Sequence, residues 1–259
     1  MSTSPLLAGG APTALIQPSE LHTLLLIARR GAIESLRDRL TLILSLFFAL
    51  VFPVAMVMVV VRPVADSPDA ADTLGFLIAL YFLLVGLLPS SAAIGSACGQ
   101  FAGEKEQGNL TPILASPASN TAIFGGKVLG AALPSLFFSV VAELAYLGTL
   151  AAVVGPDRLR LIPPALAIAM LALVPIVTTC AATVASLVSS RVRTFNAAQQ
   201  ISGLLTVPLW LVIIGLAVKL RDWGTPALIV TIAGLTALDI LLVVISARTW
   251  RREEVLAQR

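Results

Sequence analysis

The stretch 40–61, LTLILSLFFALVFPVAMVMVVV, decides the fold class, because it is long, strongly apolar and free of charged side chains. A helix of about 20 apolar residues crosses the roughly 30 Å hydrocarbon core of a bilayer. Hydrocarbon offers no partner to backbone polar groups, so such a stretch must be helical there. Five more stretches of this kind follow, at Leu74–Ser96, Val128–Val154, Leu161–Val188, Ile201–Val218 and Ala227–Ile245. The sequence therefore predicts an all-α membrane protein with six transmembrane helices.

The composition of the whole chain agrees with this prediction. Hydrophobic residues make up 58% of its 259 residues and charged residues only 12%, and the mean hydropathy is +0.96. Soluble domains carry about 25% charged residues. A soluble enzyme is therefore excluded, because one core of this size could not hide every apolar stretch. The net charge of +3 comes from basic residues scattered in ones and twos, which argues against a nucleic-acid partner and for membrane lipids as the surroundings.

The connections between the predicted spans differ in their content of lysine and arginine, which sets the expected orientation. One side would hold Arg29, Arg30, Arg37, Arg39, Lys105, Lys127, Arg191, Arg193, Arg248, Arg251, Arg252 and Arg259. The other side would hold only Arg62, Arg158, Arg160, Lys219 and Arg221. Because basic residues accumulate on the cytoplasmic side, both termini are expected there.

Two segments precede the first span. Residues 1–19 have no basic start and no unbroken apolar run, so they do not resemble a signal peptide and are expected to form a flexible cytoplasmic tail. Residues 20–39 repeat apolar side chains at spacings of three and four, which predicts an amphipathic helix along the cytoplasmic interface. This helix could simply anchor the first span or could take part in coupling. Residues 20–259 are expected to form one transmembrane domain.

The cytoplasmic connection at 97–127 contains the richest polar stretch, 101–117, FAGEKEQGNLTPILASP. Thr111 followed by Pro112 is typical of a helix N-cap and first helical position, which predicts a short helix over 112–116. Its neighbourhood combines an apolar patch with two carboxylates, formed by Leu110, Ile113, Leu114, Glu104 and Glu106. A cytoplasmic partner protein could bind such a segment through apolar burial and charge complementarity.

This connection resembles that of the type-2 ATP-binding-cassette (ABC) exporter permeases, whose pattern is approximately E-x-E-x-G-T-L-E-x-L-L-x-x-P, followed by Gly-Lys before the third span. The matching residues here are Glu104, Glu106, Gly108, Leu110, Ile113, Leu114 and Pro117, then Gly126 and Lys127. The sequence departs from the pattern at Asn109 and Thr111. Ala198-Gln199-Gln200 is similar to an Ala-Gln-Gln stretch often found before the fifth span. The resemblance covers most of the chain.

The resemblance implies a permease subunit rather than an enzyme. Two copies of the chain, or this chain and a homologous permease, would form the pathway for an exported substrate in a prokaryotic plasma membrane. Separate ATPase subunits would bind ATP and magnesium and dock on a coupling helix near Gly108–Pro117, so no cofactor is expected in this chain. The residues agree that the motor is separate, because Gly126-Lys127 lacks the other residues of a phosphate-binding P-loop.

A second ATPase contact is expected in the connection before the fifth span, at Arg191, Arg193, Gln199 and Gln200, although a lipid-facing loop explains these residues equally well. Ser91, Gly95, Gly99 and Gly103 recur every four residues, which is typical of close helix packing or, alternatively, of a hinge. Lys127 is expected to extend to the interface, and Trp210, Trp223 and Trp250 to lie in the aromatic belt.

Glu143 and Asp239 lie within predicted spans, where an ionised carboxylate costs about 2.5–3.5 kcal/mol. They could line a substrate pathway or only pack between helices. Two other functions stay open: a membrane-embedded enzyme that uses these two carboxylates, and a membrane scaffold whose cytoplasmic loop recruits a partner. A single histidine, His22, and the separated Cys98 and Cys180 predict neither a metal site nor a disulfide. The residues do not indicate the substrate.

Overall fold

The structure, a computed structural model, describes residues 19–67, 71–109, 116 and 118–250. Within these ranges every regular element is helical and no strand occurs. The first described range, 19–67, contains α1 (Glu20–Arg37), α2 (Arg39–Leu46), η1 (Phe47–Val51), α3 (Phe52–Met56), η2 (Val57–Val61) and α4 (Arg62–Ala65). The second contains α5 (Ala71–Leu87), η3 (Leu88–Ser90), α6 (Ser91–Cys98), η4 (Gly99–Gly103) and α7 (Glu104–Glu106). The last range, 118–250, contains α9 (Asn120–Val153), η5 (Pro156–Leu161), α10 (Pro164–Arg191) and α11 (Phe195–Thr249).

Five helices of the described part are long and apolar enough to cross a membrane: Arg39–Ala65, Thr73–Glu106, Asn120–Val153, Pro164–Arg191 and Leu228–Thr249. They coincide with five of the six predicted spans. The remaining prediction, Ile201–Val218, falls in the first half of α11. The chain is therefore an all-helical, multi-pass membrane protein.

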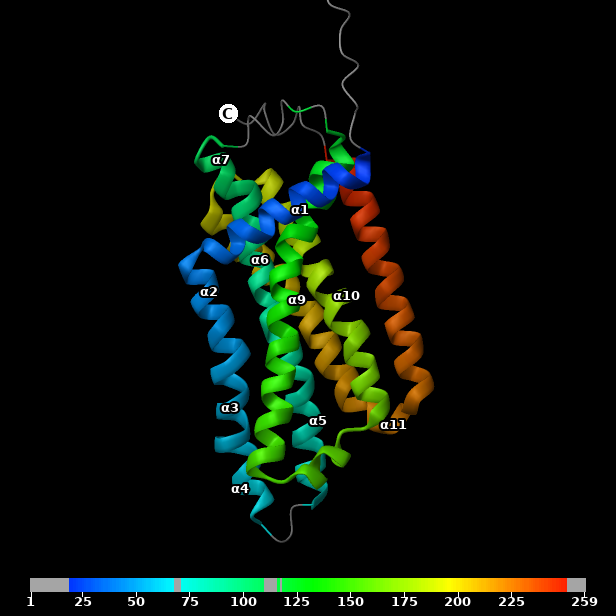
Figure 1. Cartoon of the computed structure of the whole chain (residues 1–259). Helices are drawn as coiled ribbons and strands as arrows, with labels where there is room; N and C mark the ends of the chain where they lie inside the picture. Colours follow the sequence, from blue (N-terminus) through cyan, green and yellow to red (C-terminus); the bar gives the residue numbers. More distant parts are fainter. Residues whose placement is uncertain (1–18, 68–70, 110–115, 117, 251–259) are drawn as a thin grey trace, which may run out of the picture.

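Helix α11 folds back on itself. A straight helix of 55 residues would be about 80 Å long. Its two ends nevertheless lie at the same end of the bundle, because Phe195 bonds Glu106 and the ring of Trp250 packs on that of Phe101. Figure 1 shows the two antiparallel arms, the first yellow to orange and the second orange to red. The predicted fifth and sixth spans thus correspond to the two arms of one doubled-back helix.

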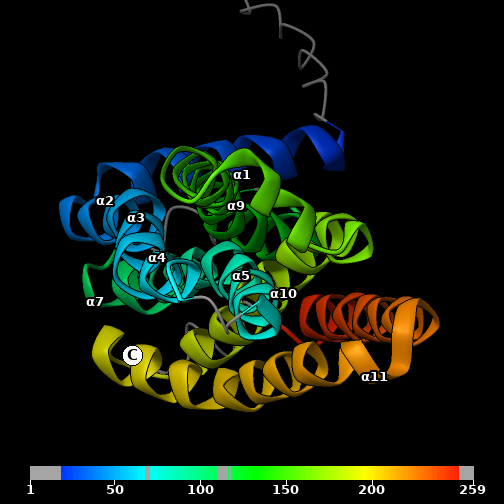
Figure 2. The same ribbon diagram turned by 90° about the horizontal axis from the view of Figure 1, so that it is seen from below.

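The helix formed by α5, η3, α6, η4 and α7, here called the second span, lies in the middle of the molecule. Figure 2 shows α5 surrounded by α3 and α4, α9, α10 and the arms of α11. In the most apolar window of the second span 56% of the residues are buried, against 6% for Leu228–Thr249. Helix α10 has the same buried share, so the second span and α10 are the internal helices of the bundle, and the second arm of α11 is peripheral.

The second span is interrupted at two places. Pro89 cannot donate a backbone hydrogen bond, and the chain tightens there into the 3₁₀ turn η3. Nearer its end the helix widens into the π-helical turn η4. Prolines at 53, 134, 175 and 208 are likewise accommodated within or between helical segments, as the sequence predicts.

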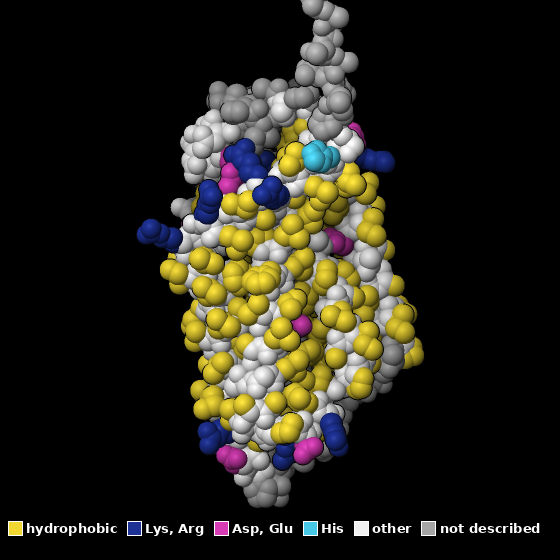
Figure 3. All heavy atoms as spheres, viewed as in Figure 1, with side chains coloured by type: hydrophobic (Ala, Val, Ile, Leu, Met, Phe, Trp, Pro, Cys, Tyr) yellow, Lys and Arg dark blue, Asp and Glu magenta, His cyan; other side chains and the backbone are white. Residues whose placement is uncertain are grey.

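The stretch predicted to be amphipathic forms α1, which crosses the first turns of α9 at one end of the bundle (Figure 1). We call this the α1 end, and the opposite one the η5 end. Figure 3 shows hydrophobic side chains covering the middle of one face, apart from isolated acidic atoms, with charged side chains gathered at both ends. The predicted tail lies outside the described residues, except for Ser19, whose hydroxyl caps α1.

Candidate functional site

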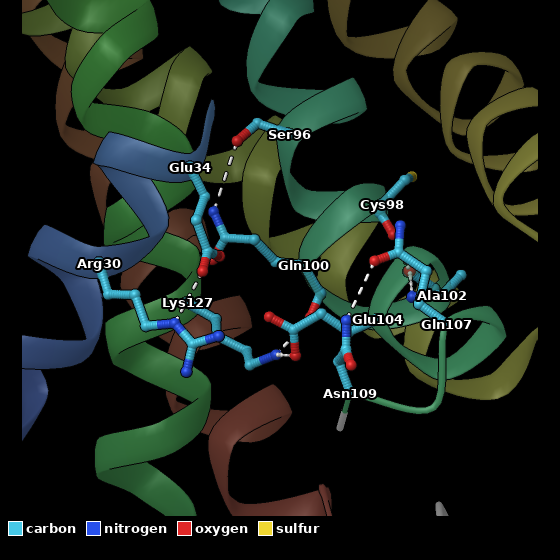
Figure 4. A network of polar contacts seen from close by, with 11 residues as sticks. Arg30, Glu34, Ser96, Cys98, Gln100, Ala102, Glu104, Gln107, Asn109 and Lys127 are labelled. Carbon is cyan, nitrogen blue, oxygen red and sulfur yellow. Dashed lines mark hydrogen bonds and ion pairs between the residues drawn. The ribbon is translucent and has the colours of Figure 1, made fainter. Parts of the chain in front are cut away.

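A buried ion pair holds the end of the second span against α9. Lys127, near the start of α9, is only 2% exposed, and its Nζ donates to the Oε2 of Glu104 at 2.6 Å (Figure 4). The same Nζ donates to the carbonyl of Gln100 and lies 4.8 Å from the centre of the Phe101 ring. A charge buried this deeply requires such partners. Lys127 therefore fixes two consecutive turns of the second span, and the prediction that it extends to the interface is wrong.

Gln100 extends this contact to α1. Its side chain is buried and forms a hydrogen bond with the hydroxyl of Ser96 at 3.4 Å (Figure 4). With the amide oriented so that both of its polar atoms are satisfied, it also donates to the Lys127 carbonyl at 3.0 Å and accepts from the Ala131 N–H at 3.3 Å. The amide lies directly against Gly31 of α1, where an added Cβ would come within 2.6 Å of the Gln100 Oε1. Any larger residue at position 31 would clash with the side chain of Gln100. Nearby, Arg30 donates to Glu34 at 2.7 Å, and this hydrogen bond raises the pKa of Arg30.

Helix α1 itself rests on two glycines of α9. An added Cβ at Gly126 would lie 2.8 Å from the Cβ of Ile27, and one at Gly130 would lie 2.8 Å from the carbonyl oxygen of Ala28. Side chains at these positions would push α1 away from α9. This crossing therefore depends on the absence of two Cβ atoms.

A serine from α10 explains the π-helical turn η4. The backbone N–H of Ala102 donates to the hydroxyl of Ser189 at 2.8 Å, and that hydroxyl donates to the carbonyl of Cys98 at 3.1 Å. In an uninterrupted α-helix Ala102 would bond Cys98 directly. A polar side chain inserted between a helical N–H and its carbonyl acceptor is a known cause of such irregular turns. Ser189 thus holds α10 to the opened turn.

Glu106 joins the second span to the start of α11. Its Oε1 accepts a hydrogen bond from the backbone N–H of Phe195 at 3.1 Å, in the first turn of α11. Thr194 caps the same turn by accepting from Ala197. First-turn N–H groups have no partner within a helix, and the positive end of the helix dipole favours a carboxylate there. The two acids of the E-x-E sequence therefore bind different elements, α9 and α11.

The chain beyond Glu106 turns sharply. Gly108 has a φ of +72°, a value that glycine adopts without strain. The N–H of Asn109 donates to the Glu104 carbonyl at 2.9 Å, and its side chain donates to Gln107 at 3.2 Å. Apart from Ser116, the predicted short helix 112–116 lies outside the described residues. The same is true of four predicted coupling residues, Leu110, Ile113, Leu114 and Pro117.

An open cavity of about 610 Å³ adjoins this network at the α1 end. Its walls come from α1, α2, the second span and the start of α11, including Arg30, Asp38, Glu106, Phe195 and Gln199. Gly95, Gly99 and Gly103 line it as well, and an added Cβ at any of the three would meet only ordinary contacts, at 3.6–3.9 Å. Ser91 is exposed and donates to the Leu88 carbonyl.

The remaining predicted contacts lie near the same end. Arg191 ends α10, and the four residues of the predicted second ATPase contact, Arg191, Arg193, Gln199 and Gln200, are all exposed. Gln199 also lines the cavity. Three aromatic rings from distant parts of the sequence form a cluster at this end. Trp250 is 4% exposed, and its ring centre lies 6.1 Å from that of Phe101 and 6.2 Å from that of Phe124. Trp250 is therefore a packing residue, and its assignment to the aromatic belt is wrong.

The two membrane carboxylates contact different places. Glu143 of α9 lies beside Gly86 and Met170, whereas Asp239 of α11 accepts from the hydroxyl of Thr179. Met170 and Thr179 are about 13 Å apart along α10. Each acid keeps one buried oxygen without a hydrogen-bond partner. In the described part no group of three His, Cys, Asp or Glu side chains could hold a metal ion.

No model of a known protein family matches the chain, and no curated protein matches it.

Proposed function

We propose that this chain is the permease subunit of an ATP-driven exporter of the type-2 ABC class. It has six transmembrane helices, the five candidate spans and the first arm of α11, in a prokaryotic plasma membrane. The α1 end and both termini face the cytoplasm. The support for this orientation is the excess of lysine and arginine in the connections at that end.

The observation that carries the proposal is the anchoring of the E-x-E sequence. Glu104 binds Lys127 of α9, and Glu106 binds the first turn of α11. The segment that follows, 107–119, therefore starts from a point fixed to three membrane helices. A force applied to this segment reaches the second span, α9 and α11 together, which is what a rigid-body coupling mechanism requires.

The partners follow from this mechanism. ATPase subunits dock at the coupling segment near Gly108–Pro117 and beside Arg191, Arg193, Gln199 and Gln200, and they bind ATP and magnesium. A second copy of the chain, or a homologous permease, completes the pathway. Glu104 faces Lys127 and its side chain is only 12% exposed, so its role is to hold the segment rather than to touch the ATPase. The separation of Glu143 and Asp239 disfavours an enzyme that uses both carboxylates.

The first test is purification of the tagged full-length chain in mild detergent, with mass spectrometry of the proteins that accompany it. We expect a stoichiometric ATPase subunit and vanadate-sensitive ATP hydrolysis. A chain that repeatedly purifies alone, without nucleotide hydrolysis, contradicts the proposal.

Glu106 tests the coupling step in that complex. Glu106→Ala removes the acceptor for the Phe195 N–H, so the coupling segment is no longer held to α11, and we expect transport-coupled ATP hydrolysis to fall severalfold. Glu106→Gln keeps an acceptor oxygen and should retain most of the activity. Asp157→Ala at the η5 end is the matched control and should change nothing. Equal activity in all three variants contradicts the coupling role.

A further inference from the structure

Glu143 occupies a space in the middle of the bundle that a glycine leaves free. An added Cβ at Gly86 of α5 would overlap its Oε1 and would lie 2.6 Å from the Cε of Met170 on α10. The carboxyl group thus points into the contact between α5, α9 and α10.

Two polar groups lie there without partners. The Oε1 of Glu143 is buried and has no hydrogen bond, and the same is true of the hydroxyl of Ser139, whose residue is 0% exposed. Residues four apart share one face of a helix, so these groups are neighbours on α9. Burying such groups without partners is costly. A bound group that forms a hydrogen bond with Glu143 or Ser139 would remove this cost.

The backbone of the second span, which faces Glu143 at Gly86, is interrupted three residues later by Pro89. Pro89 has no N–H, so the carbonyl of Val85, one residue from Gly86, lacks its helical donor. Ser90 and Ser91 donate only to the carbonyls of Leu87 and Leu88. Broken helices beside a carboxylate at mid-membrane depth are typical of cation sites in transporters.

The surroundings contain no compensating charge. Glu143 takes part in none of the ion pairs found between described residues. On the packed helices α5, α9 and α10, the charged residues Asp72, Lys127 and Arg191 stand at or near helix ends. The other titratable groups are Tyr81 on α5, Cys180 on α10 and Tyr146 on α9, whose hydroxyl donates to the Ile78 carbonyl. A neutral carboxylic acid, unlike a carboxylate, can donate a hydrogen bond to an unpaired carbonyl or hydroxyl.

We propose that Glu143, with Ser139 and the helix break at Leu88–Ser90, forms a proton-binding site inside the membrane bundle. The carboxyl group holds the proton as an O–H bond while α5, α9 and α10 are packed together. It releases the proton to water when that contact opens. The site is independent of the ATPase partner and adds a proton-sensitive step within the membrane.

The test uses the full-length chain in lipid and infrared spectroscopy. The difference between wild type and Glu143→Gln should contain the C=O band of a protonated carboxylic acid, which is lost on raising the pH. Ser139→Ala should shift this band, because it removes a neighbouring hydroxyl. Retained helical circular dichroism and a single elution peak establish that the variants fold. Absence of the band at every pH at which the protein is folded overturns the proposal.

A hydrophobic carbodiimide, which couples to protonated carboxyl groups in apolar sites, gives a second readout. We expect mass spectrometry to find it on Glu143, with labelling that falls as the pH rises. Gly86→Ala should change the labelling at least severalfold, whereas Gly148→Ala, on a part of α9 where a Cβ meets nothing within 4 Å, should not. Protection by sodium at constant pH and ionic strength would show a metal-cation site and overturn the assignment to a proton.

Discussion

The two ends of the bundle differ in one respect: both carry an exposed ion pair, Arg30–Glu34 at the α1 end and Arg160–Asp157 at the η5 end, but among the described residues only the α1 end has a buried pair as well. At the α1 end Lys127 and Glu104 meet at 2.6 Å, with side chains 2% and 12% exposed. At the η5 end Arg160 and Asp157 are 3.9 Å apart and more than 85% exposed. Buried pairs are costly to break, because the remaining partner stays uncompensated, whereas exposed pairs contribute about 0–1 kcal/mol. The comparison teaches that, among the described residues, buried charged contacts hold the α1 end together, whereas the ion pair at the η5 end is exposed to solvent.

The strongest test of this difference is removal of one charge at each end. Lys127→Met keeps the volume of the side chain but leaves Glu104 unpaired, and we expect a loss of about 3–5 kcal/mol in the free energy of unfolding. Arg160→Met should change it by less than about 0.5 kcal/mol. Denaturant unfolding in detergent, followed by circular dichroism, measures both.

A double variant sharpens the result. Lys127→Met combined with Glu104→Gln removes both charges, and it should recover part of the lost stability, because no unpaired charge is left. If Lys127→Met alone is as harmless as Arg160→Met, the α1 end does not depend on its ion pair.

A smaller effect is expected from the glycines of α9. Gly130→Ala places a Cβ 2.8 Å from the Ala28 carbonyl oxygen, so α1 must shift, at a cost of about 1–3 kcal/mol. Gly148→Ala, on the exposed side of the same helix, should instead stabilise the protein by up to about 1 kcal/mol through helix propensity. Thermal unfolding of the two variants compares them, and a shift in the same direction for both would contradict the close α1–α9 contact.

The smallest effect is expected at Asp38, which caps α2. The hydroxyl and the backbone N–H of Thr41 both donate to its carboxylate, and these hydrogen bonds lower the pKa of Asp38. A lowered pKa in the folded state stabilises the protein at neutral pH, and this contribution is lost as the pH falls through that pKa.

Asp38→Ala should therefore cost about 1 kcal/mol at pH 7, and its difference from wild type should shrink as the pH falls below about 3.9 and vanish below the lowered pKa of the folded state. Asp66→Ala, at the C-terminal end of α4, is the control and should cost nothing. Unfolding measured over a pH series checks both, and a difference that does not depend on pH would exclude a role for the Asp38 charge.

Hydropathy predicts all five candidate spans, because a stretch such as 40–61 consists of consecutive apolar residues. It did not distinguish the internal second span from the peripheral Leu228–Thr249, whose mean hydropathies are 2.2 and 2.7. Burial depends on what a helix packs against, and the polar and small residues near the end of the second span, such as Gln100 and Gly103, are the only local sign of it.

Of the residues in the network at the α1 end, the sequence pattern indicates Glu104 and Glu106 but not which residues they contact. Glu104 and Glu106 were singled out together, yet one binds Lys127 and the other Phe195, which is 89 residues away. Ser189 gave no signal, because its role is created by the turn that it opens in another helix. Contacts between distant residues follow from the packing of whole helices, which a single sequence does not encode locally.

The position of Trp250 has a consequence for the biosynthesis of the protein. Its ring closes the cluster formed by Phe101 and Phe124, yet it leaves the ribosome after every other described residue. Chains fold progressively from the N-terminus as they are made. The aromatic cluster at the α1 end therefore stays incomplete until translation has passed the last span. A nascent chain that stops earlier lacks the ring that packs on Phe101 and Phe124.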